Sequence, residues 1–196
     1  DFNGIIAGLE SNRYDASWAA FSILPDRTAV VDMVSFMNAG TAVMTQKGNE
    51  ENIASEDDLC GLTIAVQTGT SQALEVLPRF EQNCKDKGLD DIDPLIVPQQ
   101  DSANQAVSSG RAQAMLADSA LVAYYAQVQP SVYAAVPGIL VEPALIGVAM
   151  PRIDDSKLAE AYRAAIQSLI DDGTYQVILD AWNLGDVLDQ QRQIGL

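Results

Sequence analysis

Apolar residues recur along the chain with two different periods, which predicts that helices and strands alternate. Phe2, Ile5, Ile6 and Leu9 fall at positions i, i+3, i+4 and i+7, one face of a helix that ends near residues 11–13. Further helices are expected at residues 27–32, 72–87, 102–109, 119–125, 157–171 and 175–182, and strands at residues 16–20, 41–46, 62–67, 95–97, 114–117 and 146–150. Strands that alternate with helices predict an α/β fold built on parallel sheets.

The stretch Phe21-Ser-Ile-Leu-Pro-Asp-Arg27 follows the first predicted strand and is the first candidate for binding chemistry. Ser22 falls where the strand gives way to a turn, and Pro25 is favoured at the first position of a helix. Arg27 lies one turn into that helix, so its guanidinium and the Ser22 hydroxyl converge. Such a pair suits a carboxylate, because arginine offers paired donors in a planar fork. The alternative is that Arg27 pairs with a surface carboxylate such as Asp32.

A second candidate is the glycine-containing turn from Gln67 to Gln72, which runs from a predicted strand into a helix. Free backbone N–H groups and the positive end of the helix dipole suit an anion at such a turn. The Gly-Lys-Ser/Thr ending of a phosphate loop is missing, so we do not expect a nucleotide site. The alternative is an ordinary helix cap, for which Thr70 and Ser71 are suitable residues.

Asp118 is a third candidate because it ends the apolar run at residues 114–117. A carboxylate in such surroundings is poorly solvated and favours a nearby cation. Its alternative role is the N-cap of the helix that starts at Ser119. The two roles are compatible, because the side chain has two oxygens.

Composition narrows the class of protein. The chain has 196 residues, 48% hydrophobic and 19% charged, which excludes disorder and suits one or two domains. A net charge of −16 argues against nucleic-acid binding. The absence of histidine removes Ser-His and Cys-His nucleophile pairs and the common zinc sites, which excludes a hydrolase of that kind. We recognise neither a signal peptide nor an apolar run of the ~20 residues that would span a bilayer.

The stretch Asp-Ala-Ser-Trp-Ala-Ala-Phe-Ser-Ile-Leu-Pro-Asp-Arg-Thr-Ala-Val-Val-Asp at residues 15–32 resembles a known block. The block that it resembles is "Asp…Thr-x-Thr-Pro-Glu-Arg…Val-x-Phe" of family 3 solute-binding proteins. These proteins deliver polar amino acids to ABC transporters. Residues 2–9 and 173–182 are similar to two other blocks of that family. The resemblance implies a type II periplasmic-binding-protein fold of two α/β lobes, each a mostly parallel sheet flanked by helices. Residues 1–43 and 145–196 would form the first lobe, and residues 44–144 an inserted second lobe.

The same resemblance implies a role for each candidate residue. Ser22, Arg27 and Ser71, with Thr70 beside it, would bind the α-carboxylate of an amino acid, and Asp118 its α-ammonium. Phe2 matches an aromatic wall over the ligand, although it could equally be buried as core, and the amides of Gln67 and Gln72 suggest a polar neutral ligand side chain. The full set of ligand-binding candidates is Phe2, Ala20, Ser22, Arg27, Gln67, Thr70, Ser71, Gln72 and Asp118.

Two cysteines, Cys60 and Cys84, are too far apart for a CxxC metal or redox motif. In a chain that resembles an extracytoplasmic protein, an even count favours one disulfide. Two buried free thiols are the alternative.

The resemblance therefore implies a protein with no catalytic activity, no metal and no cofactor. It would be located in the periplasm, or lipid-anchored at the cell surface. Its partners would be an amino acid and the membrane permease of an ABC importer. One rival is an enzyme on the same fold, similar to the cyclohexadienyl dehydratases, which would need a general acid or base in its cleft. Another is the sensor domain of a receptor. Family members begin with a strand-helix-strand unit that is missing before residue 2, so either an upstream segment was removed or a second copy completes the lobe as a homodimer or domain swap.

Overall fold

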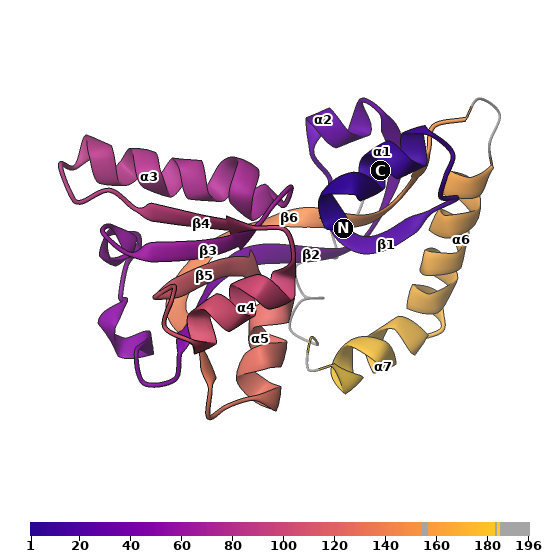
Figure 1. The fold of residues 1–196 in the computed structure, drawn as a ribbon. Helices are drawn as coiled ribbons and strands as arrows, with labels where there is room; N and C mark the ends of the chain where they lie inside the picture. Colours follow the sequence, from indigo (N-terminus) through magenta and orange to yellow (C-terminus); the bar gives the residue numbers. More distant parts are fainter. Residues whose placement is uncertain (154–156, 183, 185–196) are drawn as a thin grey trace. The chain divides into compact units, whose positions relative to one another are not determined.

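The computed structural model describes residues 1–153, 157–182 and 184, and it divides the chain into two compact units. Unit 1 comprises Asp1–Asn3 and Gly40–Pro143, and unit 2 comprises Gly4–Ala39 and Ala144–Leu196. Strands β2 (Val31–Gln46) and β6 (Tyr133–Pro151) each run through both units (Figure 1). The lobe division expected from the sequence assigns residues 1–3, 40–43 and 144 differently from these units, and as a division into lobes it stays a prediction.

Unit 1 is built on a mixed sheet. Its strands β3 (Thr63–Gln67), β4 (Asp93–Val97) and β5 (Ala114–Asp118) are parallel, β3 lying between the other two, and β5 pairs antiparallel with β2. The helices of the unit are α3 (Leu77–Asp86), α4 (Gln100–Ser108) and α5 (Ser119–Val128), and its short helical turns are η2 (Glu50–Asn52), η3 (Glu56–Leu59) and η4 (Gln72–Val76).

Successive side chains of these strands face opposite helical layers. Ile64 and Val66 of β3 pack in one cluster with Phe80 of α3, whereas Ala65 between them packs in another with Ala103 of α4. Figure 1 shows the same division, with α3 on one face of the sheet and α4 and α5 on the other. A sheet covered on both faces explains why its strands read as continuous apolar runs.

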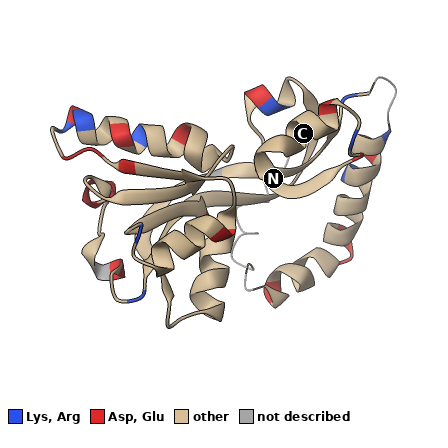
Figure 2. Ribbon diagram, viewed as in Figure 1, with Lys and Arg blue, Asp and Glu red and all other residues tan. Residues whose placement is uncertain are grey.

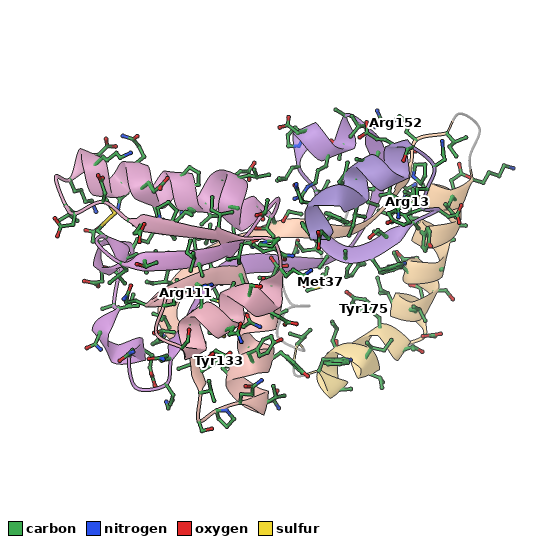
Figure 3. The ribbon with its side chains drawn as sticks, in the orientation of Figure 1. Arg13, Met37, Arg111, Tyr133, Arg152 and Tyr175 are labelled. Carbon is green, nitrogen blue, oxygen red and sulfur yellow. A yellow bond between two sulfur atoms is a disulfide. The ribbon has the colours of Figure 1, made fainter. Side chains whose placement is uncertain are left out.

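Unit 2 contains α1 (Ile5–Glu10), β1 (Ser17–Ser22), α2 (Pro25–Thr28), α6 (Leu158–Asp171), α7 (Thr174–Ala181) and parts of β2 and β6, and the short turn η1 (Phe2–Gly4) leads into it. Strand β1 pairs antiparallel with β6, and the register shifts between Ser17 and Phe21. Ile166 of α6 packs against β2 and β6 in the core of the unit. The Tyr175 hydroxyl of α7 donates a hydrogen bond to the Phe36 carbonyl of β2, and both Tyr175 and the end of α6 can be followed in Figure 3.

Most predicted elements are present, and the differences have local causes. The strands predicted at residues 41–46 and 146–150 are the ends of the much longer β2 and β6, which continue because they serve both units. The helix predicted at residues 27–32 is wrong beyond Thr28, since β2 begins at Val31. The helix predicted at residues 72–87 is divided, with η4 preceding α3 and Pro78 in the first turn of α3, where a missing N–H is tolerated.

The turn between β3 and η4 is held by Thr70. Its Oγ1 donates to the Gln67 carbonyl at 2.8 Å and accepts the Ala73 N–H at 3.2 Å. Gly69 has φ +79°, a left-handed conformation that glycine adopts without strain. The Thr70 hydroxyl thus performs the capping role that the sequence offered as an alternative.

The predicted disulfide is confirmed, and the alternative of two free thiols is wrong. Cys60 follows η3 and bonds Cys84 of α3, which is fully buried; the bond is visible in Figure 3. The same region contains a capping box in which the Asp58 carboxylate accepts the N–H groups of Ala54 and Ser55. Those hydrogen bonds lower the pKa of Asp58.

We expect the disulfide to make a large contribution to stability. Replacing Cys60 and Cys84 with serine should lower the free energy of unfolding by about 3 kcal/mol, because the bond closes a loop across 24 positions and restricts the unfolded chain. Denaturant titration measures the change. The reduced wild-type protein should match the double variant, and an unchanged unfolding midpoint in both would contradict the prediction.

Thr70→Val should lower the free energy of unfolding by about 1 kcal/mol, because it removes the hydroxyl that holds the turn before η4. The matched control is Thr70→Ser, which keeps the hydroxyl and should retain most of the stability. Both are measured by denaturant titration. Destabilisation by Thr70→Ser but not by Thr70→Val would show that the methyl group, not the hydroxyl, matters at this position.

Candidate functional site

The candidates of unit 1 gather where its parallel strands end. Because β3, β4 and β5 run in the same direction, their carboxyl ends share one edge of the sheet, the usual place for a ligand in an α/β fold. Gln67 ends β3, Pro98 follows β4, and Asp118 ends β5.

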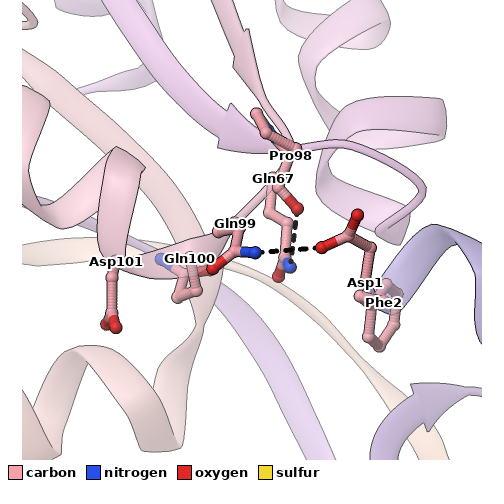
Figure 4. A pocket seen from close by; sticks show the side chains of 7 residues that line it. All are labelled: Asp1, Phe2, Gln67, Pro98, Gln99, Gln100 and Asp101. Carbon is pink, nitrogen blue, oxygen red and sulfur yellow. Dashed lines mark hydrogen bonds between the residues drawn. The ribbon is translucent and has the colours of Figure 1, made fainter.

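A cavity of about 370 Å³ opens beside Gln67. The residues that line it are Asp1, Phe2, Gln67, Pro98, Gln99, Gln100 and Asp101 (Figure 4). Gln99 Nε2 donates to Asp1 Oδ1 at 2.9 Å, and Gln67 Nε2 donates to the Pro98 carbonyl at 3.4 Å. The structure thus brings together two of the sequence candidates, Phe2 and Gln67, in one cavity.

The lining of this cavity is polar and negative. It contains three amides and two carboxylates, and none of its residues is Lys or Arg. Tyr125 of the neighbouring helix α5 donates its hydroxyl to Asp101 Oδ1 at 3.4 Å. Burial and the charge of Asp101 raise the pKa of Tyr125, so the phenol stays protonated at neutral pH. Such surroundings suit a hydrogen-bonding or cationic group.

Asp118 belongs to a connected group with two other side chains. Gln72 Nε2 donates to Asp118 Oδ1 at 2.8 Å and to Thr41 Oγ1 at 3.0 Å. Thr41 of β2 is also the register partner of Asp118. Gln72, which the sequence suggested as a contact for the ligand's side chain, is only 5% exposed and contacts Asp118; its contact with a ligand stays a prediction. Thr41 was missed, because a single threonine in a strand carries no recognisable signal.

Arg27 and Ser22 meet in unit 2 at the end of β1. The Arg27 side chain is 8% exposed, its Nη1 donates to the Ser22 carbonyl at 2.8 Å, and its guanidinium lies 5.2 Å from the centre of the Phe21 ring. The contact is with the backbone carbonyl of Ser22, so the convergence of the guanidinium with the Ser22 hydroxyl stays a prediction. Asp32 is the alternative partner that the sequence offered for Arg27. Its Oδ1 accepts a hydrogen bond from Nε of Arg152 at 3.2 Å.

Arg152 is a second arginine that the sequence reasoning passed over. Its guanidinium also donates to the carbonyls of Thr28 and Ala29, the last residue of α2 and the residue after it. No motif marks it, since it is a single basic residue after a strand. Its contacts describe a structural residue that fastens the turn between α2 and β2.

Ser71 and Ala20 are two further ligand-binding candidates from the sequence. Ser71 immediately precedes η4 in unit 1. Ala20 is an exposed residue of β1 with φ +52°, at the register irregularity of that strand. Ser22, Arg27 and Ala20 thus belong to unit 2, and the other ligand-binding candidates to unit 1.

The described residues form neither a cluster of metal ligands nor a membrane-spanning helix. Within residues 1–153, 157–182 and 184, no three or more His, Cys, Asp or Glu side chains gather as metal ligands. In the same part of the chain, no helix has both the length and the apolar character to cross a membrane.

Comparison with known sequences gives a bacterial relative. The arginine-binding protein ArgT of Corynebacterium glutamicum is 32% identical over 189 residues, which is 96% of this chain. The chain spans 60% of the length of that relative.

Two solved structures share the fold. An ancestral arginine-binding protein bound to arginine matches with a TM-score of 0.78 and 29% identity, over 93% of this chain and 77% of that one. The ancestral amino-acid-binding protein AncCDT-1, a precursor of cyclohexadienyl dehydratase, matches with a TM-score of 0.79 and 28% identity, over 92% and 74%. These matches confirm the type II periplasmic-binding-protein fold.

A family model matches residues 1–185 and describes bacterial extracellular solute-binding proteins, family 3. Members of this family bind amino acids and work with the permeases of ABC transporters. Neither the family nor these relatives support the homodimer or domain swap considered from the sequence. The chain belongs to the bacterial extracellular solute-binding proteins of family 3.

Proposed function

We propose that this protein binds a polar L-α-amino acid outside the cytoplasm and delivers it to the permease of an ABC importer, without catalysis. The observation that carries the proposal is the guanidinium of Arg27, held at the end of β1 by the Ser22 carbonyl. A buried arginine at a strand end, in a family that binds amino acids, is suited to a carboxylate.

The proposed binding mode separates the two charges of the ligand. Arg27 and Ser22 of unit 2, with Ser71 of unit 1, receive the α-carboxylate, and Asp118 of unit 1 receives the α-ammonium. Since each unit supplies part of the charge complement, the ligand has the highest affinity for a state in which both units hold it. Binding then favours closure through that differential affinity.

The cavity beside Gln67 supports a polar or cationic ligand side chain. The two glutamines alone suggested a neutral one, whereas Asp1 and Asp101 add negative charge to the same lining. L-Arginine is the first ligand to test, because ArgT and the ancestral structure are both named for arginine binding.

The rival function is an enzyme on this fold. The similarity to AncCDT-1 supports this rival. That protein binds amino acids, but it is the precursor of an enzyme. The family of this chain consists of binding proteins, which favours binding. Turnover of prephenate or arogenate by the purified protein would reverse the choice.

The proposal is tested by a thermal-shift screen of the standard L-amino acids. A ligand at a hundredfold excess over its dissociation constant should stabilise the protein by about 2.7 kcal/mol. We expect a selective rise in Tm with polar amino acids, L-arginine foremost, and no rise with D-arginine. A folded protein whose Tm responds to none of them would refute amino-acid binding.

Arg27→Ala should abolish the ligand-induced rise in Tm while leaving a cooperatively folded protein, because it removes the proposed partner of the α-carboxylate. Arg13 provides the matched control: it is an exposed arginine of unit 2 whose guanidinium lies 5.4 Å from the Tyr14 ring, much as Arg27 lies over Phe21. Arg13→Ala should keep full binding. Titration calorimetry measures both, and retained affinity in Arg27→Ala would refute the role of Arg27.

A further inference from the structure

We propose that Gln72 is a positioning residue, which orients the Asp118 carboxylate toward the ligand's ammonium and connects it to strand β2 through Thr41. The inference rests on the proposed function, since it gives Asp118 the ligand contact. It reassigns Gln72 from a contact with the ligand's side chain to a residue that acts through Asp118.

The first argument is the geometry of the Gln72 amide. Its Nε2 donates to Asp118 Oδ1 at 2.8 Å and to Thr41 Oγ1 at 3.0 Å, both within ordinary hydrogen-bond distance. An amide nitrogen has two N–H groups, so these two acceptors match its capacity. A carboxylate with one oxygen held in this way presents the other in a defined direction.

The second argument is burial. Gln72 is 5% exposed and does not line the cavity of unit 1, whereas Gln67 does line it. A buried amide is costly unless it is hydrogen-bonded, so Gln72 is stable here because of its two acceptors. Of the two glutamines, Gln67 is therefore placed for a ligand side chain and Gln72 for Asp118.

The third argument is the location of Thr41. It lies on β2 directly opposite Asp118, two residues after the point where the strand passes from unit 2 to unit 1. The preceding residue, Gly40, approaches β6 so closely that a Cβ atom there would lie 2.5 Å from the Val141 carbonyl oxygen. Gln72 thus connects the Asp118 carboxylate, through Thr41, to the part of β2 that lies close to the backbone of β6.

The test compares two glutamines that both donate to an aspartate within unit 1. Gln82 is an exposed residue of α3 whose Nε2 donates to Asp86 Oδ1 at 2.7 Å. Gln72→Met should raise the Kd for L-arginine about tenfold, the effect of losing a hydrogen bond to a charged group. Gln82→Met should leave the Kd unchanged. A folded Gln72→Met protein with wild-type affinity would overturn the proposal.

A pH profile separates orientation of Asp118 from simple packing. Gln72→Glu has nearly the same shape as the wild-type side chain, but it places a second carboxylate beside Asp118. Two carboxylates at this distance take up a shared proton as the pH falls, which restores both the donor and the wild-type charge. Between pH 8 and pH 5 the Kd of this variant for L-arginine should approach that of the wild type. A constant ratio of the two Kd values would mean that Gln72 only fills space.

A third measurement needs no ligand. Denaturant unfolding of Gln72→Met, Asp118→Ala and the double variant forms a double-mutant cycle. We expect the double variant to lose less than the sum of the single losses, because both substitutions break one contact. Additive losses would overturn the proposal even if arginine binds. Coupled losses in a protein that binds no amino acid would refute the proposed function alone and leave the connection among Gln72, Asp118 and Thr41 supported.

Discussion

The structure depends on two strands that each belong to both units. Each of β2 and β6 begins in one unit and ends in the other, so both units take part of their strand content from these two segments. Their close approach requires a residue without a side chain at Gly40, where a Cβ atom would collide with the Val141 carbonyl. Thr41, the partner of Gln72, follows Gly40 directly, and the structural residue Arg152 follows the end of β6.

Much of the fold could be predicted because the apolar periodicity and the turn residues indicated the same helices and strands. The strand at residues 62–67 and the helix at residues 157–171 each have a clear apolar pattern, and glycines mark nearby turns. The full lengths of β2 and β6 could not be predicted, because the first part of β2 contains polar residues and the first part of β6 contains prolines and a glycine, which are uncommon inside strands. The helix expected to reach Asp32 failed for a related reason: the last part of that stretch is taken into β2.

The site could be predicted only where a side chain has chemistry that is visible in one dimension. A predicted strand that is followed by Arg27, or that ends in Asp118, indicates a charged side chain at the end of that strand. In the structure Arg27 contacts Ser22 at the end of β1, and Asp118 ends β5. Gln72 was a candidate only for the ligand's side chain and Thr41 was not a candidate, because the contacts of an amide and a hydroxyl are not visible in the sequence. Arg152 is the same case, since its structural role appears only when the carbonyls of Thr28 and Ala29 are placed around it.

Electrostatics give the division into units a functional meaning. Within the proposed binding mode the buried cation, Arg27, belongs to unit 2 and the carboxylate, Asp118, belongs to unit 1. A zwitterion that met one unit alone would have only one of its charges paired, and the other would have to keep its water. Full pairing therefore requires both units, and the free energy of the second pairing is what can favour closure. A partner that fixes the direction of Asp118 strengthens this effect, because a carboxylate already oriented loses less conformational entropy when the ammonium arrives.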